Sequence, residues 1–85
     1  MAGTDFPVGP YYGDHIVDGL TISRRGKWWT AILVIEEPSN KKKFINMYRW
    51  EQKDGDWKIR KNFKINSKKD ADKLVEIINE LSQKL

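Results

Sequence analysis

The sequence predicts an α+β fold, in which a curved, four-stranded antiparallel sheet is followed by one amphipathic C-terminal helix. Two observations predict this ββββα order. β-rich runs separated by turn-forming residues extend from Gly19 to Ile65, and apolar residues recur at helical spacing after Ser67. The 85 residues suit one domain, which we place at residues 19–85, preceded by an extended N-terminal arm at residues 1–18.

The first two strands are expected to form a hairpin. Residues 20–24 alternate with a period of two, the Arg-Gly pair at 25–26 offers a tight turn, and residues 27–36 are the next β-rich run. Pairing across that turn places on the core face Leu20, Ile22, Trp29, Ala31, Leu33 and Ile35. Neighbouring residues of a strand point to opposite sides of a sheet, so Trp28 is expected outside if Trp29 is inside.

The third and fourth strands are expected at about residues 43–52 and 57–65, joined by the hairpin signal Asp54-Gly55. Strict alternation divides their residues between two faces. The face expected to meet the helix holds Phe44, Asn46, Tyr48, Trp50, Ile59, Lys61, Phe63 and Ile65. The opposite face holds Lys43, Ile45, Met47, Arg49, Lys58, Arg60, Asn62 and Lys64.

The aromatic residues have two competing uses, as core and as stacking surfaces. Core positions are expected for Trp29, Phe44 and Phe63. Trp50, Trp57 and Tyr48 fit either the core or the rim of the sheet.

The helix is expected to begin after Ser67, because Ser67 and Asp70 have the spacing of a capping box. One stripe of this helix holds Ala71, Leu74, Ile77, Ile78, Leu81 and Leu85. The stripe is broader than packing against a single sheet usually requires.

Catalytic, metal-binding and membrane functions find little support in the composition. Without Cys the chain has neither a disulfide nor a thiolate metal site, and its single His cannot form a His-based metal site alone. No Ser-His-Asp arrangement suggests itself. The longest apolar run, Ala31 to Ile35, is too short for a membrane span or a signal peptide. We therefore expect an intracellular protein that is not an enzyme and uses no cofactor or metal.

Positive charge is concentrated in one part of the chain. The net charge is +4, but residues 1–40 sum to −2 and residues 65–85 are neutral. Residues 41–64 hold nine Lys and Arg against three acids, a net charge of +6. This concentration is typical of a protein that binds a polyanion.

The cations of the second hairpin alternate with apolar residues, so they are expected to share one face of the sheet. Phosphates would meet these cations while bases stack on exposed rings. The candidate residues are Trp28, Lys43, Arg49, Lys58, Arg60 and Lys64. The alternative is an ordinary solvated sheet face.

Three segments together resemble the positive-cofactor-four transcriptional coactivators and their whirly-like relatives. They are ISRRGKWW as a first hairpin, FINMYRWEQKDGDWKIRKNFKIN as a second, and the helix KKDADKLVEIINEL. The resemblance covers roughly residues 19–82 and lies in the order and character of the elements. At the tip of the first hairpin, Arg24-Arg25 stands where the family tends to carry an aromatic residue.

The resemblance implies ββββα homodimers, in which the helices of two protomers pack together and the paired sheets form channels for single-stranded DNA. It implies binding roles for Trp50, for the basic stretch at Lys58, Arg60 and Lys61, and for Arg24 or Arg25. The candidate nucleic-acid surface is completed by Arg24, Arg25, Lys27, Trp50 and Lys61. The candidate dimer interface is Leu74, Ile77, Ile78, Leu81 and Leu85.

We therefore predict a sequence-tolerant single-stranded DNA-binding protein that acts in transcription, replication or repair. Charge favours a polyanion, and the family resemblance favours a single strand. An RNA- or duplex-DNA-binding module and a protein-interaction domain are the alternatives.

Overall fold

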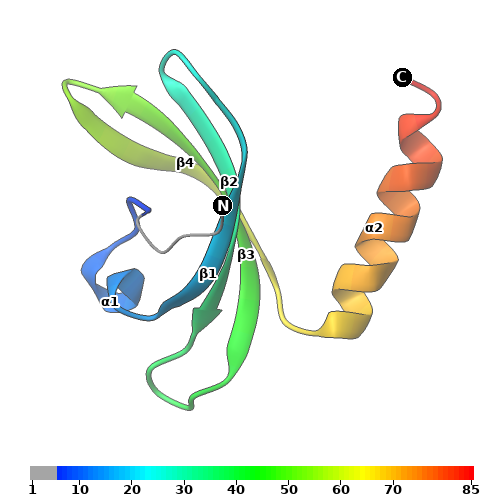
Figure 1. Ribbon diagram of the computed structural model, residues 1–85, viewed down its shortest axis with the longest axis horizontal. Coiled ribbons are helices and arrows are strands. Elements are labelled where there is room, and N and C mark those ends of the chain that lie inside the picture. Colours follow the sequence, from blue (N-terminus) through cyan, green and yellow to red (C-terminus); the bar gives the residue numbers. More distant parts are fainter. Residues whose placement is uncertain (1–5) are drawn as a thin grey trace.

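A computed structural model, which describes residues 6–85, confirms the predicted α+β arrangement. Over these residues the chain forms α1 (Pro10–Gly13), β1 (Ile16–Arg25), β2 (Trp28–Glu36), β3 (Lys43–Lys53), β4 (Asp56–Ile65) and α2 (Lys68–Ser82). The strands make one antiparallel sheet in the order β1-β2-β3-β4, so each strand pairs with its neighbour in sequence (Figure 1). The C-terminal helix follows the sheet, as expected.

The first hairpin turns one residue later than predicted. Arg25 pairs with Trp28, which leaves Gly26 and Lys27 as the turn. Gly26 has a φ of +56°, and a glycine at the first central position is typical of a type II′ turn. The alternation expected for β1 is then broken by a bulge between Thr21 and Ser23.

This bulge reverses the faces predicted for the first half of β1. Thr21 pairs with Ala31, and its Oγ1 accepts a hydrogen bond from the Trp29 indole Nε1 at 3.0 Å. Leu20 and Ile22, expected in the core, are exposed instead. One unpaired residue is enough to invert every side chain beyond it.

The second hairpin turns at Asp54-Gly55, as predicted. Both residues have positive φ, of 54° and 84°, which is the backbone of a type I′ turn. A bulge between Arg49 and Trp50 in the β3–β4 pairing again overturns the strict alternation. The change places Phe63 opposite Met47 on the other face of the sheet, whereas strict alternation had expected Phe63 on the same face as Trp50.

All the buried side chains except Ile65 gather on one side of the sheet, which we call the core face. Its residues are Ile16, Trp29, Ala31, Leu33, Ile35, Phe44, Asn46, Tyr48 and Trp50. The residues packed against it are Phe6, Val8 and Tyr12 from the N-terminal segment, with Trp57 from β4. Figure 1 shows this segment and α1 on one side of the sheet and α2 on the other. Trp29 and Phe44 are buried as predicted, whereas Phe63 is 56% exposed.

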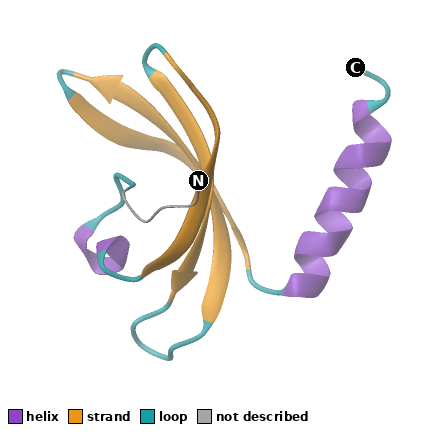
Figure 2. Ribbon diagram, in the orientation of Figure 1, coloured by secondary structure: helices purple, strands orange, loops and turns teal. Residues whose placement is uncertain are grey.

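The helix α2 begins where the capping box predicted. Ser67 is its N-cap, and its side-chain oxygen accepts a hydrogen bond from the Asp70 backbone N at 3.1 Å. The expected packing of this helix on the Trp50 face is wrong, because the N-terminal segment occupies that face. No residue of Lys68–Ser82 is buried, and α2 stands away from the sheet (Figure 2).

The N-terminal arm is shorter than predicted and belongs to the folded unit. β1 already begins at Ile16, three residues before the expected boundary at Gly19. Residues 6–13 pack on the core face, and residues 1–5 of the predicted arm lie outside the described residues. Among the described residues, no helix is long and apolar enough to cross a membrane.

Candidate nucleic-acid interface

The sheet face opposite the core face, which we call the outer face, carries an exposed tryptophan beside an arginine. Trp28 is 40% exposed, while its neighbour Trp29 points into the core, as strand alternation predicted. The Arg49 guanidinium lies over the Trp28 ring, 4.6 Å from the ring centroid. Such a cation–π pair contributes roughly 0.5–1 kcal/mol at an exposed site. The ring and the cation therefore form one unit that offers stacking and positive charge together.

Further cations reach the same face through the pairing of the strands. Arg25 pairs with Trp28, and Lys61 pairs with Arg49, so the register places all of them on the outer face. We call this region, at the hairpin-tip end of the outer face, the basic surface. It consists of Arg25, Trp28, Arg49, Lys58, Arg60 and Lys61. Arg49 and Lys61 are directly opposite each other, an arrangement of like charges that destabilises a sheet and that a bound anion would relieve.

One acidic residue lies within the basic surface. Glu51 pairs in register with Lys58, and its Oε1 accepts a hydrogen bond from the Arg60 Nε at 2.9 Å. An ion pair exposed to solvent contributes about 0–1 kcal/mol, so a phosphate can compete for Arg60 at little cost. Arg60 is the extra residue of β4 at the irregularity between Arg49 and Trp50, which we call the β4 bulge. The bulge brings Arg60 to the outer face together with Lys61.

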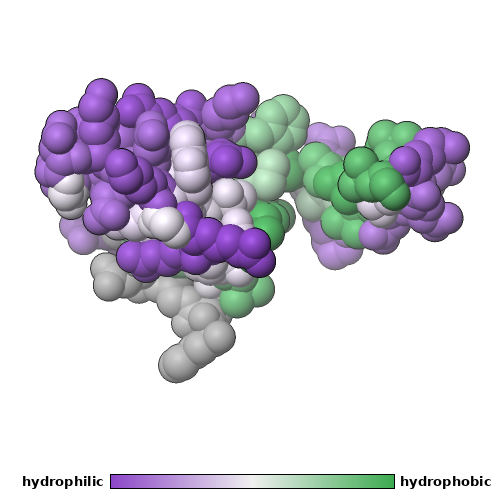
Figure 3. All heavy atoms as spheres, turned by 90° about the horizontal axis from the view of Figure 1, so that it is seen from above, coloured by the Kyte–Doolittle hydropathy of each residue, from purple (hydrophilic) through white to green (hydrophobic). Residues whose placement is uncertain are grey.

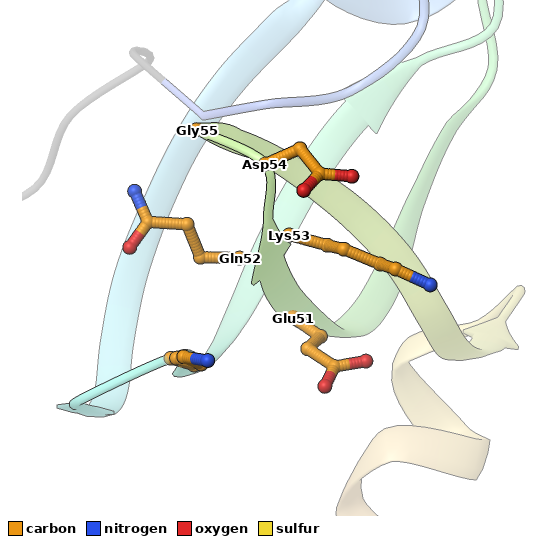
Figure 4. Close-up of a pocket in the computed structure, with 6 residues that line it drawn as sticks. Glu51, Gln52, Lys53, Asp54 and Gly55 are labelled. Atoms are coloured by element: carbon orange, nitrogen blue, oxygen red, sulfur yellow. The ribbon is translucent and has the colours of Figure 1, made fainter.

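The tips of the two hairpins lie next to each other. The Gln52 backbone N donates to the Lys27 carbonyl oxygen at 2.7 Å, which ties the first turn to β3. A hollow between the tips is lined by Lys27 and residues 51–55 (Figure 4). In this hollow Gln52 points away from Lys53, as alternation along β3 requires. Lys27 and Lys53 are balanced in this hollow by Glu51 and Asp54, so the rim adds no net positive charge to the basic surface.

Four of the predicted binding residues lie elsewhere. Trp50 is fully buried at 0% exposure, so its predicted role as an exposed stacking ring is wrong for this conformation. Arg24 is on the core face, where its guanidinium lies 4.1 Å from the Trp29 ring centroid. Lys64 also lies on the core face, over Phe44 at 4.2 Å, because the β4 bulge reverses its direction. Lys43 pairs with Glu36, at the end of the sheet away from the hairpin tips.

The other half of the outer face is apolar and is turned towards α2. Figure 3 shows apolar residues (green) on the side of the sheet that faces the helix and on the helix itself. The exposed apolar side chains there include Leu20, Ile32, Phe63, Ile77, Ile78 and Leu81. We call this region the apolar surface. Of the predicted dimer-interface residues, Leu85 lies beyond the end of α2, and Leu74 is partly buried.

The N-terminal segment is held at two places, whose partners Glu37 and Trp50 the sequence did not reveal. The Tyr11 and Tyr12 hydroxyls donate to the two carboxylate oxygens of Glu37, at 2.6 and 3.0 Å. The hydrogen bond from Tyr11 lowers the pKa of Glu37, and the bond to Glu37 raises the pKa of both tyrosines. At the other end, the Trp50 indole Nε1 donates to the Pro7 carbonyl oxygen at 2.9 Å. The aromatic residues of the segment were the sequence feature that indicated such an attachment.

Comparisons with models of protein families, with characterised proteins and with solved structures found no match to this chain. Among the described residues, no group of three His, Cys, Asp or Glu side chains is placed to hold a metal ion.

Proposed function

We propose that this protein binds single-stranded DNA without strong sequence preference, through the basic surface on the outer face of the sheet. The observation that carries the proposal is the exposed Trp28 ring with Arg49 over it, flanked by Arg25, Lys58 and Lys61. Aromatic rings that stack bases and cations that neutralise phosphates are the two components of single-strand recognition.

A single strand suits this surface better than other polyanions do. Its unstacked bases can reach a ring such as Trp28, whereas the bases of a duplex are stacked on each other. The ββββα order agrees with the resemblance to the positive-cofactor-four coactivators, which also favours single-stranded DNA. The proposed roles in transcription, replication or repair follow from this ligand.

The proposed active form is a homodimer joined through the apolar surface. Monomeric proteins rarely expose a large contiguous apolar patch, and a two-fold interface buries the same patch on both subunits. Phe63 on the sheet and Ile78 on α2 are more than half exposed. A second copy would cover both, while the basic surface lies at the other, hairpin-tip end of the outer face.

Titration of a labelled oligothymidylate at several salt concentrations tests the proposal. Wild-type protein is expected to bind, with an affinity that falls steeply as salt rises. The double variant Lys58→Ala/Lys61→Ala removes two proposed phosphate contacts. It should therefore reduce the slope of log affinity against log salt by about 1.4, or about 0.7 for each lysine on a single strand.

The matched control is Lys69→Ala/Lys84→Ala, which removes the same charge from exposed positions at and beyond α2. Its slope should equal that of the wild type. Absence of binding at low salt, or equal slopes for both double variants, would contradict the proposal. Competition with RNA and with duplex DNA at fixed salt shows whether the protein prefers one of these two ligands to single-stranded DNA.

A protein-interaction domain is the second candidate, and the exposed apolar surface is the observation that favours it. In that case the cations serve only solubility. The Lys58→Ala/Lys61→Ala variant would then keep its partner binding, and the wild type would not bind any of the three nucleic acids.

A further inference from the structure

The core face is covered in an unusual way. A sheet face this rich in aromatic rings is normally buried by a helix or a second sheet, but α2 lies on the other side (Figure 1). Its cover is the short N-terminal segment, residues 6–13, which we call the strap. The rings beneath the strap belong to Trp29, Tyr48 and Trp50.

The strap places an aromatic ring against the tryptophans. The Phe6 ring is stacked on Trp50, with 6.1 Å between centroids and 17° between planes, and lies 5.5 Å from Trp29. Tyr48 continues the stack from Trp50 at 5.3 Å and 12°. Phe6 therefore occupies the position that a planar ligand would take on this surface.

The strap is attached by few directional contacts. Within the described residues, the backbone hydrogen bonds of residues 6–13 stay inside the segment or end at His15, and none joins a strand. The hydrogen bonds that hold the strap to the rest of the protein come from side chains: Trp50 to Pro7, and Tyr11 and Tyr12 to Glu37. The strap can therefore leave without breaking the backbone pairing of the sheet.

A polar atom without a partner also lies on the covered face. Asn46 is only 6% exposed, and its side-chain Oδ1 has no hydrogen-bond partner. A buried acceptor without a hydrogen-bond partner destabilises the fold, and a donor that reached it would remove this penalty. Nucleobases carry N–H donors, the ring N3–H of thymine among them, so a base on this face could satisfy the Asn46 oxygen as well as stack.

Positive charge connects this face with the basic surface. Arg24 points to the core face, and Arg25, the next residue, points to the outer face. The two arginines therefore place positive charge on both faces at the β1 edge of the sheet. Lys64 lies at the far side of the core face, over Phe44. A DNA strand bound to the basic surface could thus continue onto the core face, where it would meet Arg24 at one end of the face and Lys64 at the other.

We propose that the strap is an intrachain competitor, whose Phe6 occupies a stacking surface on Trp29 and Trp50 that a base of the bound single strand takes when the strap leaves. The identity of this ligand rests on the proposed function. The Tyr11 and Tyr12 contacts with Glu37 are the latch that keeps the strap closed.

The test compares the affinity of the full chain for a labelled oligothymidylate in three forms. These are the wild type, Phe6→Ala and Tyr11→Phe/Tyr12→Phe. Phe6→Ala removes a competing aromatic contact of about 0.5–1.5 kcal/mol, so its affinity should rise about 2- to 12-fold. The tyrosine variant opens the latch without touching the stacking surface or the net charge, and its affinity should rise as well.

A second measurement follows the indole N–H groups by NMR. The Trp50 N–H should lose its protection from solvent exchange and shift when oligonucleotide is added, because Pro7 leaves. The Trp29 N–H donates to Thr21 within the sheet, so it should keep its protection from solvent exchange and is the internal control for the exchange measurement. If Phe6→Ala fails to fold by circular dichroism, the tyrosine variant and the Trp50 signal decide the question.

The outcomes separate this inference from the proposed function. If the wild type binds, the variants bind no more tightly and the Trp50 signal is unchanged, the strap is only part of the core, and the competitor role is wrong while the function stands. If no form binds at low salt, both are wrong. Tighter binding by the variants together with a shifted Trp50 signal supports the competitor role.

Discussion

Two adjacent tryptophans have opposite roles because they are adjacent on a strand. Trp29 is in the core, against Phe6 and Trp50, while Trp28 is on the outer face under Arg49. The pair can be assigned in this way from sequence alone once one of them is known to be inside. Trp50 was not assignable, because a ring next to a hairpin turn fits both core and rim.

Replacing Trp28 should weaken the binding of single-stranded DNA more than it weakens the fold. Trp28→Ala removes the proposed stacking ring and should cost roughly 1–3 kcal/mol of binding free energy, measured by oligonucleotide titration. Trp28→Phe keeps an aromatic face and should retain part of the affinity. Wild-type affinity in Trp28→Ala would exclude this ring from the interface.

The latch between the strap and Glu37 should depend on pH at both ends of the range. Hydrogen bonding lowers the pKa of Glu37 from its ordinary 4.5, so the stability that the carboxylate contributes is present above pH 4.5 and is lost as pH falls through its lowered pKa. Hydrogen bonding raises the pKa of Tyr11 and Tyr12 from 10.0. Their contribution is present below pH 10.0 and is lost as pH rises through their raised pKa values.

A pH titration of tryptophan fluorescence measures this latch, because the strap covers Trp50. Wild-type protein should show a change below pH 4.5 and another above pH 10.0. Both changes should be reduced in Tyr11→Phe/Tyr12→Phe. Superimposable curves for the two proteins would show that the hydroxyls do not hold the strap.

At the scale of the element, two bulges decide which residues reach which face. The β1 bulge moves Leu20 to the outer face, and the β4 bulge moves Phe63 there while turning Lys64 to the core face. The apolar and basic halves of the outer face both follow from these irregularities. A bulge is set by the twist and register of paired strands, so a single strand's alternation does not reveal it.

The β3–β4 hairpin should be sensitive to backbone conformation at its turn. Gly55 has a φ of +84° with nothing within 4 Å of an added Cβ, so Gly55→Ala introduces strain without a clash. It should lower the free energy of unfolding by about 1–2 kcal/mol in a urea denaturation. Gly13→Ala, which also has open space but no positive φ, should be close to neutral. Equal stability of the two variants would contradict this account of the turn.

At the scale of the whole molecule, the single chain is more open than a compact domain. Its Cα radius of gyration is 13.8 Å, against about 12 Å expected for a compact domain of 85 residues. The difference reflects α2, which stands away from the sheet with its apolar stripe exposed. The proposed second copy would cover the apolar surface that one chain leaves exposed.

Thermal stability should therefore depend on protein concentration, because association favours the folded state by mass action. The melting temperature should rise with concentration in the wild type, and light scattering should give a dimer. Ile78→Asp should abolish both effects, while Lys69→Asp, on the same helix, should preserve them. If light scattering gives the mass of a monomer at every protein concentration, the proposed homodimer is wrong.

The sequence by itself determined what depends on neighbours along the chain. The strands, the Asp54-Gly55 turn, the Ser67 cap and the opposite directions of Trp28 and Trp29 all follow from local periodicity and turn chemistry. Only the tertiary structure decided which segment covers which face, because that is a competition between distant segments for the same apolar surface. The strap, with Phe6 on Trp50, takes the face that α2 was expected to cover, and the bulges then place the basic and apolar halves on the other.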